Sequence, residues 1–172
     1  MDALALRELV AADSRALRDL RLHALRTEVG LFFSNYEAEA GHSDAHWLTL
    51  ASGDEQHQLF GLFDGDRLVG MTGVFVDRDD PSGHTAALGM SYIRPEYRGR
   101  GFAAMFYEAR LAWARARPHF ARAVVGHRRS NTASRRLIER CGFRWTRTRL
   151  NHWADGTDEE HVGYELPLDD RS

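Results

Sequence analysis

The chain has 172 residues, of which 43% are hydrophobic and 28% are charged, and its net charge is -2 at pH 7. This balance is typical of a globular domain with a packed core, and no apolar run approaches the roughly 20 residues of a membrane-spanning helix. The first residues lack the pattern of a signal peptide, and a single cysteine, Cys141, excludes an intrachain disulfide. We therefore expect one domain, residues 1–172, located in the cytoplasm and not in a membrane.

All 23 basic residues are arginines. The lack of lysine excludes a P-loop lysine, a Schiff-base lysine and a Ser-Lys dyad. Fifteen of the arginines lie between Arg94 and Arg149, a stretch that holds only three acidic residues. Such a basic segment favours a polyanionic partner, either a phosphorylated cofactor or a nucleic acid, although a solvated arginine-rich surface is the alternative.

Alternating apolar residues and turn signals predict the elements of the first half of the chain. A helix should begin at Asp13 or Ser14, whose side chains are suited to capping, and should run to about Thr27. We expect strands at residues 4–9, 58–63 and 68–76, with a hairpin turn at 64–66 and a loop plus a second helix within 29–52.

In the second half, a strand at residues 86–93 should stop before Pro95. Helices are predicted at 101–117 and 131–140, and strands at 120–126, 143–150 and 161–168. The resulting order, β-α-α-β-β-β-α-β-α-β-β, predicts the α/β class, with a mixed sheet and flanking helices.

A glycine-rich turn, Arg98-Gly99-Arg100-Gly101-Phe102-Ala103, joins a predicted strand to a predicted helix. Glycines allow the backbone to approach a ligand, and the first N–H groups of a helix have no partner within it. Together they predict a site for an anion such as a pyrophosphate. A plain glycine turn before a helix is the alternative, and the surrounding Pro95-Glu96-Tyr97 sequence makes the binding site the stronger interpretation.

The spacing Gly99-x-Gly101-x-x-Ala104 also fits the dinucleotide fingerprint. That motif normally opens its domain and requires an acidic residue about 20 positions later. Residues 119–122 contain no acid, and about half of the chain precedes the turn. We therefore do not favour a nicotinamide cofactor.

The segment Ile93-Arg94-Pro95-Glu96-Tyr97-Arg98-Gly99-Arg100-Gly101-Phe102-Ala103 resembles the central motif of the GNAT superfamily of N-acetyltransferases. Asn131, Leu137 and Cys141-Gly142-Phe143 resemble the family's next segment, in which an asparagine opens a helix that ends in Gly-Phe. The resemblance spans nearly the whole chain. It implies an acyl-CoA N-acyltransferase fold, with a mostly antiparallel sheet flanked by helices.

The resemblance implies acetyl-CoA as acyl donor and direct transfer to a primary amine of a small molecule or peptide. The backbone of Ser91, Tyr92 and Ile93 would pair with the pantetheine arm, and one N–H would polarise the thioester carbonyl. Asn131 would bind the cofactor arm. The implied pyrophosphate cradle comprises Arg98, Gly99, Arg100, Gly101, Phe102, Ala103 and Ala104.

The sequence departs from the family at both usual proton-transfer positions. Ile138 stands where many members have the tyrosine that protonates the leaving thiolate, and Gly126 stands where some have a glutamate base. Ser134 lies on the same helix face as Ile138 and is a candidate to reach the sulfur, or it bonds its own backbone. Because of these departures, a catalytically silent CoA-binding module is the alternative function.

The resemblance places the amine acceptor between the region after the first helix and the last hairpin. Carboxylates and aromatic rings would suit a cationic amine there. We name Glu37 and His127 as candidate bases, although each has an ordinary structural explanation as well. The residues of this predicted wall are Glu28, Phe32, Phe33, Tyr36, Glu37, His152, Trp153 and Asp155.

Other functions have little support in the sequence. The nine histidines and one cysteine show no ligand spacing typical of zinc, so we predict no metal site. Aromatic residues do not alternate with the arginines as in a nucleic-acid-stacking surface, so we expect no nucleic-acid partner. Cys141, at a predicted helix end, is interpreted as a packing residue. Similar proteins are often dimers, so a homodimer is possible.

Overall fold

In this computed structural model, residues 3–168 are described; the outermost positions of the predicted domain 1–172 lie outside the described residues. Seven strands form one sheet in the order β1-β2-β3-β4-β5-β7-β6. The strands are β1 (Leu4–Glu8), β2 (His57–Asp64), β3 (Arg67–Val76), β4 (Thr85–Ile93), β5 (Arg122–Arg128), β6 (Arg144–His152) and β7 (Asp158–Pro167). Every pair is antiparallel except β4 with β5, which confirms the predicted mixed, mostly antiparallel sheet.

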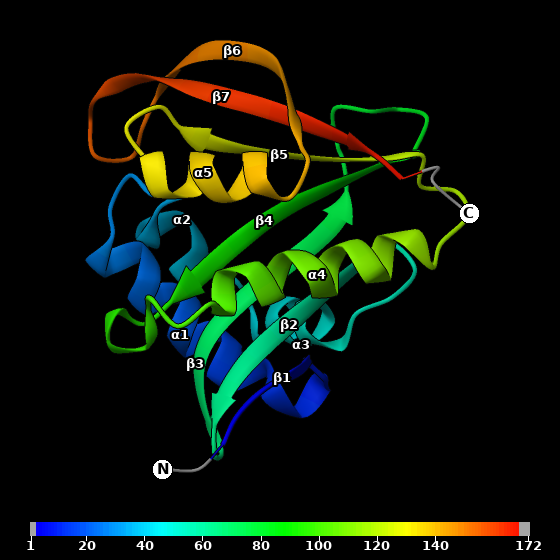
Figure 1. Cartoon of the computed structure of the whole chain (residues 1–172). Coiled ribbons are helices and arrows are strands. Elements are labelled where there is room, and N and C mark those ends of the chain that lie inside the picture. Colours follow the sequence, from blue (N-terminus) through cyan, green and yellow to red (C-terminus); the bar gives the residue numbers. More distant parts are fainter. Residues whose placement is uncertain (1–2, 169–172) are drawn as a thin grey trace.

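Five α-helices flank this sheet (Figure 1). They are α1 (Ser14–Thr27), α2 (Tyr36–Ala40), α3 (Asp44–Ser52), α4 (Phe102–Arg115) and α5 (Thr132–Arg140). In the view of Figure 1, α4 crosses the near face of the sheet, while α1 and α3 lie behind it. Within residues 3–168, none of the helices is long and apolar enough to cross a membrane.

The second predicted helix within residues 29–52 is in fact two helices, α2 and α3. Asn35 caps α2 by accepting a hydrogen bond from the Ala38 N–H at 2.9 Å, and Ser43 caps α3 by accepting from the His46 N–H at 3.2 Å. Gly41 separates the two caps. Two capping residues in one segment therefore mark two helix starts, and the prediction of a single helix was wrong.

Apolar side chains fill both sides of the sheet. On one side, Phe60, Tyr107 and Ile138 belong to a buried cluster that joins the sheet to α4 and α5. On the other, Leu17, Leu20 and Trp47 join α1 and α3 to the strands. The two clusters bury residues of β2, β3 and β4 on both sides of the sheet, and β4 is the strand that borders the cavity.

Candidate active site

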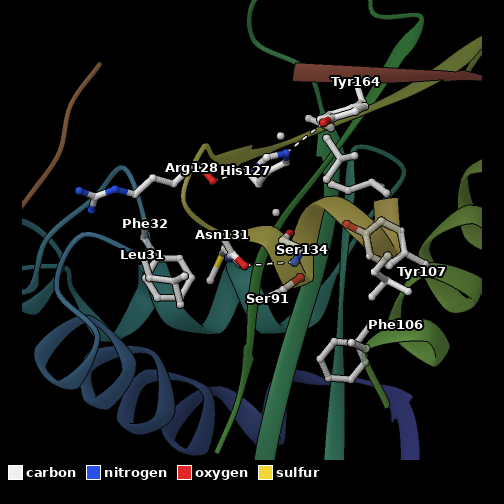
Figure 2. Close-up of a pocket in the computed structure, with 18 of the residues that line it drawn as sticks. Leu31, Phe32, Ser91, Phe106, Tyr107, His127, Arg128, Asn131, Ser134 and Tyr164 are labelled. Carbon is white, nitrogen blue, oxygen red and sulfur yellow. Dashed lines mark hydrogen bonds between the residues drawn. The ribbon is translucent and has the colours of Figure 1, made fainter. Parts of the chain in front are cut away.

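The parallel strands β4 and β5 pair over only three residues each, Thr85–Ala87 and Arg122–Val124. Beyond these pairs the strands diverge, and α5 lies at the side where they separate (Figure 1). A cavity of about 1570 Å³ occupies this gap. Its walls come from β4, β5, β7, α4, α5 and the loop after α1, so segments distant in the sequence meet there (Figure 2).

A bulge interrupts β4 beside the cavity. The register with β3 shifts between the pairs Met71↔Tyr92 and Gly73↔Gly89, and Met90 has a positive φ of 56°. A bulged residue is left out of the ladder, so its peptide groups are available to another partner. Ser91 is held from the side: its Oγ lies 2.7 Å from Thr72 Oγ1 and accepts from Arg110 Nη1 at 3.2 Å.

The predicted residues Ser91, Tyr92 and Ile93 all line this cavity, with Tyr92 buried and Ser91 exposed. Tyr92 and Ile93 also pair with β3, opposite Met71 and Gly70. The edge of β4 that faces the gap is therefore the place where an extended ligand can lie along the strand.

The glycine-rich turn ends at the start of α4. Gly101 is the N-cap residue, with a φ of 86°, and no side chain caps the helix. Gly99 also has a positive φ of 75°, and a Cβ at either glycine would meet no described atom within 4 Å. The first N–H groups of α4 therefore remain accessible, and the positive end of the helix faces the cavity. Gly99, Gly101, Phe102, Ala103 and Ala104 all line it.

The two arginines of the turn have partners within the chain. Arg98 donates from Nη2 to Glu28 at 2.5 Å and from Nε to the Ile93 carbonyl at 2.7 Å. Arg100 donates to the Glu96 carbonyl at 3.0 Å and does not line the cavity. Arg98 thus ties the turn to the residue after α1, and backbone groups form most of the predicted cradle.

Asn131 and Ser134 lie at the start of α5, facing the cavity (Figure 2). Asn131 Oδ1 accepts a hydrogen bond from the Ser134 N–H at 3.1 Å, so the side chain caps the helix. Its amide NH₂ remains as a donor for a ligand. Ile138, one turn beyond Ser134, is fully buried and belongs to the core.

Tyr107 and Arg110 of α4 also line the cavity, and both are buried. The guanidinium lies 4.5 Å from the Tyr107 ring centroid and donates to the Phe106 carbonyl at 3.1 Å. Burial raises the pKa of Tyr107, so its phenol stays protonated. Sequence reasoning missed both residues, and the only available signal was an arginine on the apolar face of α4.

His127 is buried between two polar partners. Its Nδ1 lies 2.7 Å from the Arg128 carbonyl oxygen, which can only accept, so Nδ1 carries a proton. Its Nε2 lies 3.1 Å from the Tyr164 hydroxyl and accepts from it (Figure 2). Both nitrogens of this predicted base are therefore engaged, although the ring lines the cavity.

The other predicted base, Glu37, is exposed on α2 and does not line the cavity. Its neighbour Glu39 points inward and forms an ion pair with Arg21, at 2.7 and 2.8 Å. Burial raises the pKa of the Glu39 carboxyl, but the hydrogen bonds and charge of Arg21, together with Ser34 and His42, outweigh burial and lower the pKa. Glu39 is thus an ionised partner of Arg21, and Glu37 lies outside the cavity.

Aromatic rings form one wall of the cavity. The rings of Phe33 and Trp153 stack with centroids 5.1 Å apart, and Phe33 meets His161 edge-on at 4.9 Å. We call Phe33, Trp153 and His161 the aromatic wall. Of the predicted wall residues, Glu28, Phe32, Phe33 and Trp153 line the cavity, whereas Tyr36, Glu37, His152 and Asp155 do not.

Two further predictions concern metals and Cys141. Among residues 3–168, no three His, Cys, Asp or Glu side chains come together in an arrangement suited to a metal ion. Cys141 lies at the end of α5 and does not line the cavity. Burial raises the pKa of its thiol, which makes it a poor nucleophile.

The sequence that forms this site matches a known protein family. The model of the acetyltransferase (GNAT) family matches residues 20–143. The chain belongs to this family. The GNAT resemblance and fold predicted from the sequence are therefore confirmed. No curated protein sequence matches this GNAT chain at a significant level.

Solved GNAT structures share the fold. A GNAT-family acetyltransferase from Streptococcus pneumoniae aligns with a TM-score of 0.80 at 17% identity, over 96% of this chain and 99% of its own. A putative acetyltransferase from Salmonella typhimurium, solved with acetyl-CoA, gives 0.82 at 17% identity, over 99% and 97%. Spermidine N-acetyltransferase from Vibrio cholerae, solved with CoA and spermine, gives 0.72 at 18% identity, over 96% and 95%.

Proposed function

We propose that this GNAT chain transfers an acetyl group from acetyl-CoA directly to a primary amine of a small molecule or peptide. One observation carries the proposal: the cavity between β4 and β5 joins the uncapped start of α4 and the β4 bulge to the aromatic wall. Acetyl-CoA bound at the start of α4 and along the β4 bulge would meet, at the bulge, an amine bound against the aromatic wall. Such positioning is the main requirement of a direct transfer.

The residues present fit the donor. The pyrophosphate would bind the first N–H groups of α4, where Gly99 and Gly101 leave space. The pantetheine arm would pair with β4 at Ser91–Ile93, and the Asn131 amide would donate to it. Acetyl-CoA supplies an activated thioester, whose carbonyl oxygen needs a hydrogen-bond donor as charge develops. A peptide N–H of the bulge is suited to that role.

The leaving thiolate needs a proton, and we propose that one of two hydroxyl groups supplies it. Ser134, the candidate from the sequence, and Tyr107, found in the structure, both line the cavity from the α5 and α4 sides (Figure 2). Since burial keeps the Tyr107 phenol protonated, it serves as a donor at neutral pH. One of these two hydroxyl groups would take the role of the family's tyrosine, because the residue at that position here is the buried Ile138.

The acceptor side supports a cationic amine of unspecified size. Aromatic rings attract ammonium groups, and Phe33 and Trp153 of the aromatic wall line the cavity. The nearby carboxylates of Asp155 and Glu159 do not line it and are paired with Arg128. Structural neighbours include spermidine N-acetyltransferase and the ribosomal-protein-S18-alanine N-acetyltransferase from Escherichia coli, so small polyamines and peptide N-termini are both reasonable test substrates. The cytoplasmic location and the homodimer stay predictions from the sequence.

The test measures thiol release from acetyl-CoA in the presence of spermidine, spermine, simple diamines and a peptide with an N-terminal alanine. Calorimetry with CoA measures donor binding separately. We expect saturable CoA binding and amine-dependent thiol release with at least one acceptor. CoA binding without transfer to any amine would instead support the silent binding module, and no CoA binding would overturn the proposal as a whole.

A further inference from the structure

The side chain of His161 occupies the space that a side chain at position 126 would need. A Cβ built on Gly126 would lie 2.1 Å from His161 Nε2 and 2.3 Å from His161 Cε1. The register explains this overlap: β5 and β7 pair Gly126 with Gly163 and Arg128 with His161, so all four residues share one face. The imidazole can lean across the neighbouring strand because residue 126 has no side chain.

Position 126 is the place where some GNAT members carry a glutamate base. This chain therefore lacks a carboxylate on β5 and has in its place an imidazole reaching over from β7. His161 lines the same cavity as Ser91 and Ser134 and belongs to the aromatic wall. His161, 35 positions later in the chain, thus lies where a side chain of residue 126 would lie.

His161 is free to accept a proton. No hydrogen bond joins its ring to another residue in the described part of the chain, whereas both nitrogens of His127 are engaged. The ring is partly buried, and burial lowers its pKa below the ordinary histidine value. The titratable and charged groups facing it are His127 and Arg128 on β5 and Arg147 and Arg149 on β6. Of these, His127, Arg147 and Arg149 lower the pKa in the same direction as burial.

We infer that His161 is the general base of the acetyl transfer and stands in for the missing carboxylate at position 126. This inference rests on the proposed function. The unprotonated ring nitrogen takes a proton from the acceptor ammonium group, and the amine lone pair then attacks the thioester carbonyl carbon. A C–N bond forms, and the C–S bond breaks with its electron pair going to sulfur. The thiolate gains a proton from the hydroxyl of Ser134 or Tyr107, and that oxygen takes the second proton of the amine nitrogen in return. His161 then releases its proton to solvent.

The first experiment compares His161→Ala and His161→Gln with the wild type, using an amine that the wild type acetylates. We expect kcat/KM to fall by about 100-fold or more, the usual contribution of a general base. The wild-type profile of kcat/KM should rise with pH through a pKa below that of ordinary histidine, and this limb should vanish in both variants. CoA affinity should not change. His152→Ala is the matched control, because His152 is an exposed residue of the same hairpin outside the cavity.

The second experiment moves the base back to β5. In Gly126→Glu combined with His161→Ala, the new side chain takes the space that the imidazole vacates, and its Cβ lies 3.0 Å from the Val162 carbonyl oxygen, a tight contact. The double variant should exceed His161→Ala in kcat/KM. Added imidazole should also raise the rate of His161→Ala. Wild-type kcat/KM in the His161 variants would overturn the inference while leaving the proposed function intact. A wild type that binds CoA and acetylates no amine would instead overturn both.

Discussion

Arg128 donates a hydrogen bond from Nη1 to the carbonyl oxygen of Gly30 at 3.2 Å, and this contact joins the end of β5 to the loop after α1. The same nitrogen donates to Asp155 at 2.7 Å, and the guanidinium lies 5.1 Å from the ring centroid of Trp153. Gly30 permits this approach, because a Cβ there would lie 2.6 Å from the Asp155 carboxylate and 2.7 Å from Arg128. One side chain therefore holds both segments that carry the aromatic wall.

Replacing Arg128 should weaken the acceptor side alone. In Arg128→Ala, the loop after α1 loses its link to the last hairpin, and we expect the KM of the amine to rise by roughly tenfold, as for loss of one charge-assisted hydrogen bond. Calorimetry should show unchanged CoA affinity. Arg129→Ala is the control, since Arg129 is an exposed residue paired with Glu160 outside the cavity. An equal loss of CoA affinity in Arg128→Ala would contradict this division of roles.

The glycine at the start of α4 should be required for donor binding. In Gly101→Ala, a side chain is forced into a φ of 86°, which costs about 1–2 kcal/mol, or a fall in Tm of roughly 2–8 °C for a chain of this size. The strained turn should also displace the first N–H groups of α4, so CoA should bind more weakly.

Gly83→Ala provides a matched control for this strain. Gly83 has a φ of 73°, a Cβ there would meet no described atom within 4 Å, and the residue does not line the cavity. The control should lose similar stability and keep CoA affinity. Equal CoA affinity in the Gly101 and Gly83 variants, measured by calorimetry, would show that the turn does not bind the cofactor.

Because Asp155 is ionised in the folded state, the stability of the protein should fall as the pH is lowered into the acid range. Hydrogen bonds from Thr157 and Arg128 lower the pKa of Asp155 from 3.8 to about 2. A lowered pKa stabilises the folded state at pH above the unfolded value, and this contribution is lost as pH falls from about 4 to about 2. The Tm of Asp155→Asn should therefore decrease less steeply than that of the wild type over this range. Parallel Tm curves would contradict the assignment.

Cys141 should be dispensable for the reaction. Its thiol is held protonated by burial and lies away from the cavity, so Cys141→Ser should keep kcat within about twofold of wild type. Initial rates at varied acetyl-CoA and amine should give intersecting double-reciprocal lines, as expected for direct transfer. Parallel lines would indicate an acetyl-enzyme intermediate.

The features predicted from the sequence are the strands and the start of α4, which depend on local patterns and on a family motif. Alternation of apolar residues placed the strands, and the turn from Arg98 to Ala103 placed the start of α4, because both signals lie within a few neighbouring residues. The bulge at Met90 carries no such local signal, since its positive φ belongs to a residue that seldom adopts one.

The contacts of the candidate site depend on register between distant segments. That His161 covers Gly126 follows from the pairing of β5 with β7, which a single sequence does not specify. The same limit explains the placement of Glu37, whose helix turns Glu39 inward toward Arg21. Residue types at the site were thus partly predictable, whereas their distances to one another were not.

The most direct test of the proposed acetyl transfer uses acetyl-CoA labelled with ¹³C at the acetyl carbonyl. The enzyme is incubated with spermidine, spermine, simple diamines and the alanine-starting peptide, and the labelled carbonyl is followed by NMR. We predict that the label moves into the amide of at least one primary amine, with one CoA thiol released for each amide formed. Saturable CoA binding with the label remaining in the thioester for every amine would contradict the proposed function.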